Sequence, residues 1–287
     1  MQFLNSKVDE VFLNNQKYFI KRDDLISVDF SGNKARKLYY FLNNDLKGIK
    51  KIISHGSIQS NAMYSLSVLC KMKNIEFLYY VSHIPQYLKD NIEGNYQKAL
   101  QNGMKVVIGD VEKSFSKDTL FINEGAAVKE ASVGVEILAN EIKTWAKEKD
   151  IKNLKVFLPS GTGTTALYLQ KFLPYQVLTC SCVGDDLYLK KQFLTLEEKN
   201  HPTILQKAKK YHFGKLYREL YIKHLELLKN SGIEFDLLYD SLGWIVFEEY
   251  VKNLQNKDDF TFLYIHQGGV LGNESMKKRY RYKFTNF

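Results

Sequence analysis

The sequence predicts an α/β protein whose sheets are largely parallel. Short runs of apolar and aromatic residues alternate along the chain with longer segments in which apolar residues recur at helical spacing. Polar or glycine-rich loops follow two of these runs, at the places where open α/β sheets bind ligands. The 287 residues are enough for one large or two modest domains with substantial cores.

The predicted elements follow one another in strand–loop–helix order. The predicted strands cover residues 51–54, 75–81, 104–108, 156–158, 176–179 and 262–265. The predicted helices cover residues 61–73, 87–102, 128–149, 166–172 and 242–254. Gly103 marks the end of the second of these helices, and lysines are frequent near the end of the third.

Composition bounds the class and the setting of the protein. Hydrophobic residues make up 45% and charged residues 25%, as in ordinary globular proteins. No apolar run approaches the length of a membrane span, and the first residues do not resemble a signal peptide. The three cysteines cannot pair completely, and strand alternation gives Cys180 and Cys182 a packing role on one face. We therefore expect a reduced, cytoplasmic protein without a membrane partner.

The formal charge of +9 raises the question of nucleic-acid binding. Its densest basic cluster, residues 277–283, interleaves lysines and arginines with tyrosines, which could follow a phosphate backbone and stack on bases. Such a segment is more often a solvated last element or packs its aromatic rings on the protein. No recognisable nucleic-acid-binding signature accompanies the charge, so we do not expect nucleic acid as a partner.

Lys34 stands at the start of a predicted helix, where Ser31 can cap the helix and Gly32 keeps the approach open. The positive potential of a helix N-terminus favours the neutral amine, which is the form that makes a Schiff base with an aldehyde. The alternative is a solvated lysine on a cationic face, because Arg36 and Lys37 follow closely.

Two loops between strands and helices carry side chains suited to ligand binding. In the loop over 54–61, Ser60 and Asn61 offer a hydroxyl and an amide, although both are also preferred helix caps. The loop over 159–165 combines glycines and hydroxyls at a helix start, which suits phosphate. It lacks the lysine of a P-loop and the full dinucleotide spacing, so a small phosphate monoester is the best fit, unless the loop is only structural.

A helix-start lysine, a Ser-Asn loop and a phosphate loop together describe a pyridoxal phosphate site. These segments resemble the 1-aminocyclopropane-1-carboxylate (ACC) deaminase and D-cysteine desulfhydrase family. The segments that carry the resemblance are Lys21-Arg22-Asp23-Asp24-Leu25, Gly32-Asn33-Lys34-Ala35-Arg36-Lys37-Leu38, Gln59-Ser60-Asn61, Asn123-Glu124-Gly125-Ala126, Gly161-Thr162-Gly163-Thr164-Thr165 and His266-Gln267-Gly268-Gly269. They occur in the family's order from about residue 17 to residue 272.

The resemblance implies a tryptophan synthase β-like fold with two α/β domains and pyridoxal 5'-phosphate in the cleft between them. The implied large domain comprises 1–45 and 154–287, with a small domain inserted over 46–153. A homodimer and a small amino-acid substrate are also implied.

The resemblance further implies a role for each matching residue. Lys34 would form the Schiff base with the cofactor and move protons at the substrate α-carbon. Asn61 would hold the cofactor's ring hydroxyl, and Gln59 and Ser60 would face the substrate carboxylate or an attacking proton donor. The phosphate would be held by the loop residues, Gly161, Thr162, Gly163, Thr164 and Thr165.

Tyr239 and Asp240 resemble the family's pair beside the pyridine nitrogen. An acid there keeps the ring nitrogen protonated, as in the deaminase pattern, whereas desulfhydrases have threonine. Asp240 is therefore a candidate cofactor-binding residue, and Tyr239 a candidate catalytic residue in cyclopropane opening. The alternative for Asp240 is that it caps the helix over 242–254.

Several positions depart from the family pattern. Ser241 and Leu242 replace a Gly-Lys pair, Ala62 replaces a histidine, and Phe213 stands where a second tyrosine belongs. Because cyclopropane opening involves both phenols, we rank β-elimination, as from D-cysteine to pyruvate, hydrogen sulfide and ammonia, above ACC deamination. A member that binds the cofactor or an amino acid without turnover is the third hypothesis.

Overall fold

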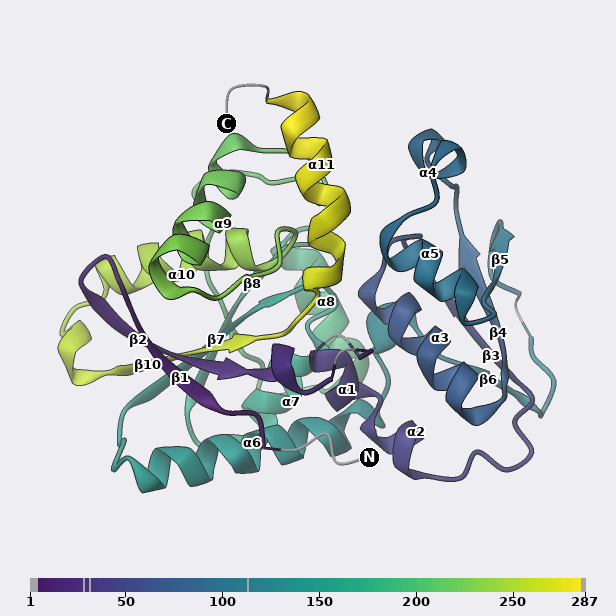
Figure 1. Ribbon diagram of the computed structural model, residues 1–287. Helices are drawn as coiled ribbons and strands as arrows, with labels where there is room; N and C mark the ends of the chain where they lie inside the picture. The colour runs from purple at the N-terminus through teal and green to yellow at the C-terminus, as the bar shows by residue number, and fades with distance from the viewer. Residues whose placement is uncertain (1–4, 28, 31, 113, 285–287) are drawn as a thin grey trace.

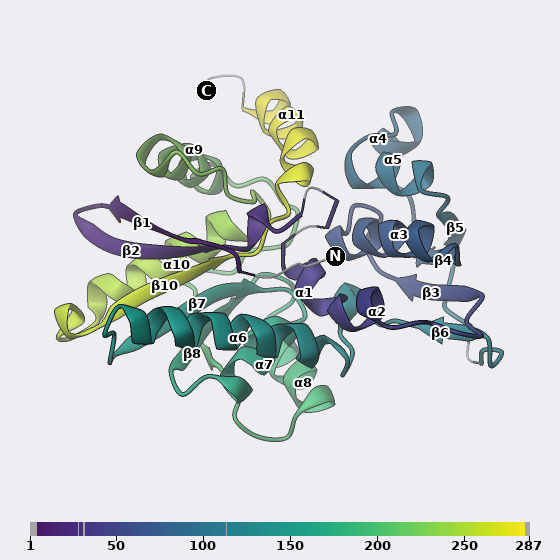
Figure 2. The same cartoon turned by 60° about the horizontal axis from the view of Figure 1, so that its bottom comes forward.

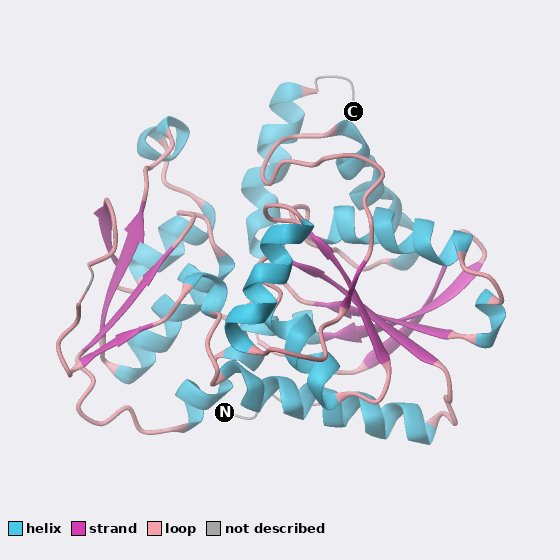
Figure 3. Cartoon of the chain, turned by 180° about the vertical axis from the view of Figure 1, so that it is seen from behind, coloured by secondary structure: helices cyan, strands magenta, loops and turns pink. Residues whose placement is uncertain are grey.

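The computed structural model describes residues 5–27, 29–30, 32–112 and 114–284. They form a larger and a smaller sheet, each packed against helices (Figure 1). The larger sheet has the order β1-β2-β10-β7-β8-β9 and the smaller β5-β4-β3-β6. Their strands are β1 (Val8–Leu13), β2 (Gln16–Arg22), β3 (Lys51–His55), β4 (Glu76–Val81), β5 (Lys105–Ile108), β6 (Thr119–Phe121), β7 (Leu154–Ser160), β8 (Gln176–Ser181), β9 (Thr203–Ile204) and β10 (Thr261–His266). All strand pairs except β1–β2 are parallel, as the sequence predicts (Figure 3).

The helices occupy the connections between the strands. They are α1 (Asn33–Lys37), α2 (Tyr39–Asn43), α3 (Asn61–Lys73), α4 (Gln86–Asp90), α5 (Gly94–Gln101), α6 (Ala131–Glu148), α7 (Thr164–Phe172), α8 (Asp186–Leu196), α9 (Arg218–Ser231), α10 (Asp240–Asn253) and α11 (Asn273–Lys283). Single 3-10 turns occur at η1 (Asp23–Leu25), η2 (Glu124–Ala126), η3 (Lys257–Asp259) and η4 (Val270–Gly272). No helix in the described part of the chain is both long and apolar enough to cross a membrane.

The predicted helix over 87–102 is wrong, because the structure divides it into α4 and α5. The interruption ends at Gly94, whose φ of +65° favours glycine, and the preceding carbonyl of Glu93 accepts a hydrogen bond from Gln59.

The hairpin of β1 and β2 is not among the elements predicted from the sequence. Its two-residue turn is Asn14-Asn15, with φ of 50° and 61°, a recognised hairpin conformation for asparagine.

Each face of the larger sheet has its own core. On one face, α6 and α7 pack through Val135, Leu138 and Ala166 against alternate strand residues. On the other face, α9 and α10 pack around Trp244 and Phe247. Figure 2 shows the helices on the two sides of the sheet.

The predicted domain boundaries at 45/46 and 153/154 stay a prediction. The packing of α6 on the larger sheet favours an earlier end for the inserted unit.

A buried ion-pair network holds α1, the helix that contains Lys34, to the larger unit. The fully buried guanidinium of Arg36 contacts both oxygens of Asp23, at 3.2 and 2.9 Å, and both oxygens of Glu141, at 2.7 and 2.8 Å. Lys21 contacts Glu141 at 2.7 Å. Sequence analysis placed Arg36 and Lys37 on a solvated face as the alternative for this segment, and their burial shows that this alternative is wrong.

Replacing Arg36 with Met should lower the free energy of unfolding by about 3–5 kcal/mol, because buried Asp23 loses the guanidinium that pairs with it and Glu141 keeps only Lys21 of its two cations. Denaturant unfolding measures this loss. The matched control is Lys105→Met, which removes an exposed pair with Glu76 and should cost less than about 1 kcal/mol. Equal effects of the two substitutions would contradict a structural role for the network.

Candidate active site

A cavity lies between the two sheets, where the loops after β3, β7 and β10 meet α1 and the start of α10. Its walls include residues from most of the segments that the sequence analysis singled out: Asn33, Lys34, Ser60, Asn61, Glu124, Gly125, Gly161, Thr162, Gly163, Thr164, Thr165, Tyr239, Asp240, Gln267 and Gly268. The structure therefore brings the predicted lysine, Ser-Asn pair and phosphate loop to one place.

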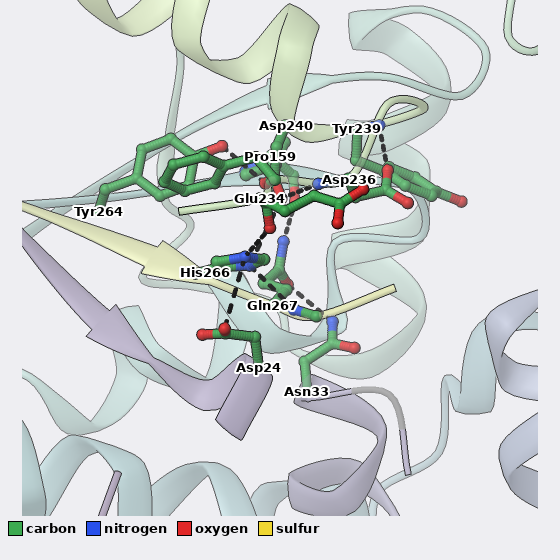
Figure 4. Close-up of polar contacts among 12 residues, drawn as sticks. Asp24, Asn33, Pro159, Glu234, Asp236, Tyr239, Asp240, Tyr264, His266 and Gln267 are labelled. Atoms are coloured by element: carbon green, nitrogen blue, oxygen red, sulfur yellow. Dashed lines mark hydrogen bonds and ion pairs between the residues drawn. The ribbon is translucent and has the colours of Figure 1, made fainter. Parts of the chain in front are cut away.

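Lys34 is half-buried at the cavity wall, and a chain of side chains holds it. Its Nζ donates to Asn33 Oδ1 at 2.9 Å, and Asn33 Nδ2 donates to Gln267 Oε1 at 2.7 Å. Gln267 Nε2 in turn donates to the carbonyl of Pro159 at 2.7 Å (Figure 4). Burial lowers the pKa of Lys34 to about 8, although Asp236 acts in the opposite direction. The neutral amine is therefore far more accessible near neutral pH than in an ordinary lysine.

The physical reason for this lowered pKa differs from the predicted one. Helix α1 has only 5 residues, so burial rather than a helix terminus favours the neutral amine. The predicted cap, Ser31, lies outside the described residues. Gly32 precedes the helix with φ +32°, and a Cβ there would lie 2.2 Å from the carbonyl oxygen of Gln267, so only glycine allows this approach.

Lys37 also lines the cavity, one turn after Lys34, and the sequence analysis did not identify it as a site residue. Its buried Nζ donates to the carbonyl of Gly125 at 2.5 Å. Burial and the nearby charge of Lys34 lower the pKa of Lys37 well below its ordinary value. The only sequence signal was its spacing of three residues from Lys34 on the same helix face.

Ser60 and Asn61 reach the cavity from the start of α3. Ser60 caps the helix, because its Oγ accepts from the N–H groups of Ala62 and Met63 at 3.1 and 3.4 Å. The predicted capping role is thus present together with a place at the cavity wall. Asn61 Oδ1 accepts from Asn95 at 2.8 Å, which fixes the orientation of its amide.

Gln59 is not among the residues that line the cavity. Its Nε2 donates to the Glu93 carbonyl at 3.1 Å, and its Oε1 accepts from the Tyr96 N–H at 3.2 Å. Both ends of the amide therefore fasten the start of α5, and the predicted role of Gln59 toward a substrate carboxylate stays a prediction.

The phosphate loop precedes α7, whose first residue is Thr164. Gly163 has φ +73°, and a Cβ there would lie 2.4 Å from the Phe193 ring, so the loop requires glycine. The hydroxyls of Thr162 and Thr164 are 3.2 Å apart. The buried Thr165 Oγ1 has no hydrogen-bond partner among the described residues. Since buried hydroxyls are normally paired, this orphan at a helix start fits an anionic group in the loop.

If the loop holds the phosphate of the pyridoxal phosphate that the resemblance implies, replacing Thr165 with Ala should weaken binding of this cofactor by about 1–2 kcal/mol, which is the cost of one lost hydroxyl hydrogen bond. The stability of the cofactor-free protein should hardly change, because the deleted hydroxyl has no partner there. Equilibrium dialysis and thermal unfolding measure the two effects. Thr165→Ser, which keeps the hydroxyl, is the control, and equal cofactor affinity in both variants would move the phosphate elsewhere.

The start of α10 places Asp240 at the cavity wall (Figure 4). Its carboxyl group accepts from the Tyr264 hydroxyl at 2.7 Å and from the Asp236 N–H at 3.1 Å. The alternative that Asp240 caps this helix is wrong. Asp236 has that role, because its Oδ1 accepts from the N–H groups of Leu238 and Tyr239 at 2.8 and 2.6 Å.

Burial raises the pKa of Asp240 well above its ordinary value, and the charge of Asp236 is the next largest cause. Sequence analysis did not identify Asp236, although an aspartate shortly before a helix is a recognised cap signal.

Tyr239 packs beside Gly161 and against Phe213. The ring centroids of Tyr239 and Phe213 are 5.1 Å apart. The neighbour of Tyr239 at this position is therefore a phenyl ring without a hydroxyl, and Phe213 is 40% exposed.

No known protein-family profile matches the chain. A protein of Pyrococcus horikoshii, provisionally named 1-aminocyclopropane-1-carboxylate deaminase, is 31% identical over 164 residues, which are 51% of this chain and 48% of that relative. A protein of Pyrococcus abyssi with the same provisional name is 23% identical over 88% of this chain and 84% of its own length. The first match therefore spans about half the length of the relative.

Solved structures match over almost the whole chain. An ACC deaminase homologue has a TM-score of 0.75 at 20% identity, covering 98% of this chain and 94% of its own. A pyridoxal 5'-phosphate-dependent aspartate racemase has a TM-score of 0.60 at 11% identity, covering 92% and 90%. These likenesses show the fold, which is the tryptophan synthase β-like α/β fold that the sequence analysis expects. The comparisons also confirm the resemblance to ACC deaminase-like proteins.

Proposed function

We propose that the protein is a pyridoxal phosphate-dependent enzyme that carries out β-elimination and deamination of a small amino acid. D-cysteine, giving pyruvate, ammonia and hydrogen sulfide, is the proposed substrate. The observation that carries the proposal is that Lys34, with its lowered pKa, and the unpaired Thr165 hydroxyl belong to the same cavity. An amine that reacts with an aldehyde and an anchor for a phosphate are the two groups that this cofactor requires.

The bound cofactor would supply the electron sink for a carbanion at the substrate α-carbon. Lys34, held by Asn33, would take and return the α-proton as a neutral amine. The residues of the loop over 161–165 would hold the phosphate. Ser60 and Asn61 would orient the substrate carboxylate and the ring hydroxyl, and Asp240 would hold a proton at the ring nitrogen.

ACC deamination is the second candidate, and the provisional names of the two Pyrococcus relatives favour it. The contact of Tyr239 with Phe213 rather than with a second tyrosine supports β-elimination instead, because a phenyl ring cannot transfer a proton. Cofactor or amino-acid binding without turnover is the third candidate. It would explain the departures at Ser241 and Leu242 but not the retained Lys34.

We also propose that the protein is a homodimer and that it is located in the cytoplasm. Sedimentation of the purified protein would test the dimer.

The proposal is tested on purified protein incubated with pyridoxal phosphate. Borohydride should fix the cofactor to the peptide that contains Lys34, as measured by mass spectrometry. D-cysteine should then yield pyruvate and sulfide, whereas ACC should yield little or no 2-oxobutanoate. Turnover of ACC alone would favour the second candidate. Cofactor attachment without turnover of any small amino acid would favour the third.

A further inference from the structure

Asp240, at the cavity wall, is the first of a line of polar side chains that continues through His266 to Asp24 (Figure 4). His266, the last residue of β10, is fully buried, and its ring lies between two carboxylates. Its Nδ1 is 3.6 Å from Asp240 Oδ2, and its Nε2 is 3.7 Å from Asp24 Oδ2. Arg22 holds Asp24 through two contacts, at 2.9 and 2.7 Å.

The larger sheet brings these residues together. Strands β2 and β10 are parallel neighbours, and His266 is directly opposite Arg22 in their register. Asp24 follows two residues later in η1, so its carboxylate reaches the end of β10. Two segments that are far apart in the sequence, 21–25 and 266–269, therefore meet behind the cavity, and the proposed chemistry leaves His266 and Asp24 without a role.

The hydrogen bonds of His266 define its protonation in the cofactor-free protein. Its Nε2 donates to the Glu234 carbonyl at 2.9 Å, and its Nδ1 accepts from the Gly268 N–H at 3.2 Å. The ring is therefore neutral, with its acceptor nitrogen facing Asp240. Burial lowers the pKa of His266, and the charge of Arg22 lowers it further. The carboxylates of Asp24 and Asp23 act in the opposite direction.

The surroundings of Asp240 disfavour its charged form. Burial raises the pKa of Asp240, and the charges of Asp236 and Asp24 raise it further. Among the described residues, its carboxyl group accepts hydrogen bonds only from the Tyr264 hydroxyl and the Asp236 N–H. A protonated ring nitrogen in the cavity would need the carboxylate form. A ring nitrogen that is already protonated cannot take the proton that Asp240 loses. That proton then passes to solvent or to a neighbouring base, and His266 Nδ1, 3.6 Å from Asp240 Oδ2, is such a base.

We propose that His266 is a positioning residue that takes the carboxyl proton of Asp240 when a cationic ring nitrogen occupies the cavity. The O–H bond of Asp240 breaks and an N–H bond forms at His266 Nδ1, so the proton stays within the protein. Asp24, held by Arg22, faces the resulting imidazolium, and the Gly268 N–H turns away from Nδ1. The inference rests on the proposed function, because only a pyridinium-type group requires this charge on Asp240.

The first test is ¹⁵N NMR of the His266 ring in the wild-type protein. Addition of pyridoxal phosphate should move the Nδ1 resonance into the range of a protonated nitrogen, and an unmoved resonance in the loaded protein would overturn the proposal. In the cofactor-free protein, Asp24→Asn should lower the pH midpoint of His266 by about 1 unit, because it removes a charge that favours the imidazolium, whereas Asp240→Asn replaces a carboxyl group that still holds its proton and should change the midpoint little. Asp9→Asn, which removes the other carboxylate that Arg22 contacts, should change it much less.

The second test measures the kinetics of the protein with pyridoxal phosphate bound. His266→Gln and Asp24→Asn should each lower kcat by about tenfold while KM and cofactor dissociation change little. A merely structural role would instead weaken cofactor binding and lower stability together. If the protein binds no cofactor, the proposed function fails, whereas an Nδ1 resonance of His266 that stays unprotonated in the cofactor-bound protein overturns only this inference.

Discussion

Replacing Lys34 with Ala should abolish covalent attachment of pyridoxal phosphate and lower turnover by about 10³-fold or more. Within the part of the chain that the structure describes, the side chain of Lys34 makes one hydrogen bond, to its neighbour Asn33, and burial already disfavours its charge. Its removal should therefore leave the fold and the thermal unfolding temperature nearly unchanged. Borohydride labelling followed by peptide mass measurement, together with steady-state kinetics, checks the two parts of this prediction.

The matched control is Lys37→Met, which removes the second buried lysine of the same cavity. The borohydride label should remain on Lys34 in this variant, even if the phosphate is held less tightly. A label that persists in Lys34→Ala but disappears in Lys37→Met would assign the covalent role to Lys37. The spacing of three residues makes this comparison necessary, because both amines are on one face of α1.

Replacing Asp240 with Asn should lower kcat by on the order of 10²-fold while cofactor dissociation changes by less than about tenfold. The amide can hydrogen-bond but cannot provide the negative charge that stabilises a protonated ring nitrogen. Because burial and the charge of Asp236 raise the pKa of Asp240, its charged form is disfavoured in the folded protein, and a neutral substitute should cost little stability. Stopped-flow kinetics and dialysis separate the two effects.

Asp240→Glu is the control, since it keeps the charge and adds one methylene. It should retain much more of kcat than the asparagine variant does. Wild-type kcat in Asp240→Asn would exclude the pyridinium role and favour desulfhydrase-like chemistry, which tolerates a neutral partner. Helix capping no longer competes as an explanation, because Asp236 provides the cap of α10.

Local sequence patterns were sufficient for most of the parallel sheets. Buried runs such as 51–54 and 262–265 lie within β3 and β10, because strands covered on both faces have continuous apolar sequence. The short strands β6 and β9, of 3 and 2 residues, carry too few side chains to show any periodicity. The division of α4 from α5 depends on Gly94 and on a contact with Gln59, which no local pattern reveals.

By itself, the sequence determined that Lys34, the pair Ser60–Asn61 and the loop over 161–165 belong to one site. Lys34 is part of a local motif at a helix start, and the other two are local motifs between a strand and a helix, where an amine, glycines and hydroxyls have a direct chemical meaning. Only the tertiary structure decided which groups set their charges. Asn33 and Gln267, for example, are 234 positions apart and hydrogen-bonded beside Lys34, and burial rather than a helix terminus lowers its pKa. Desolvation and charge pairing depend on what surrounds a group in space, so they arise only when the chain has folded.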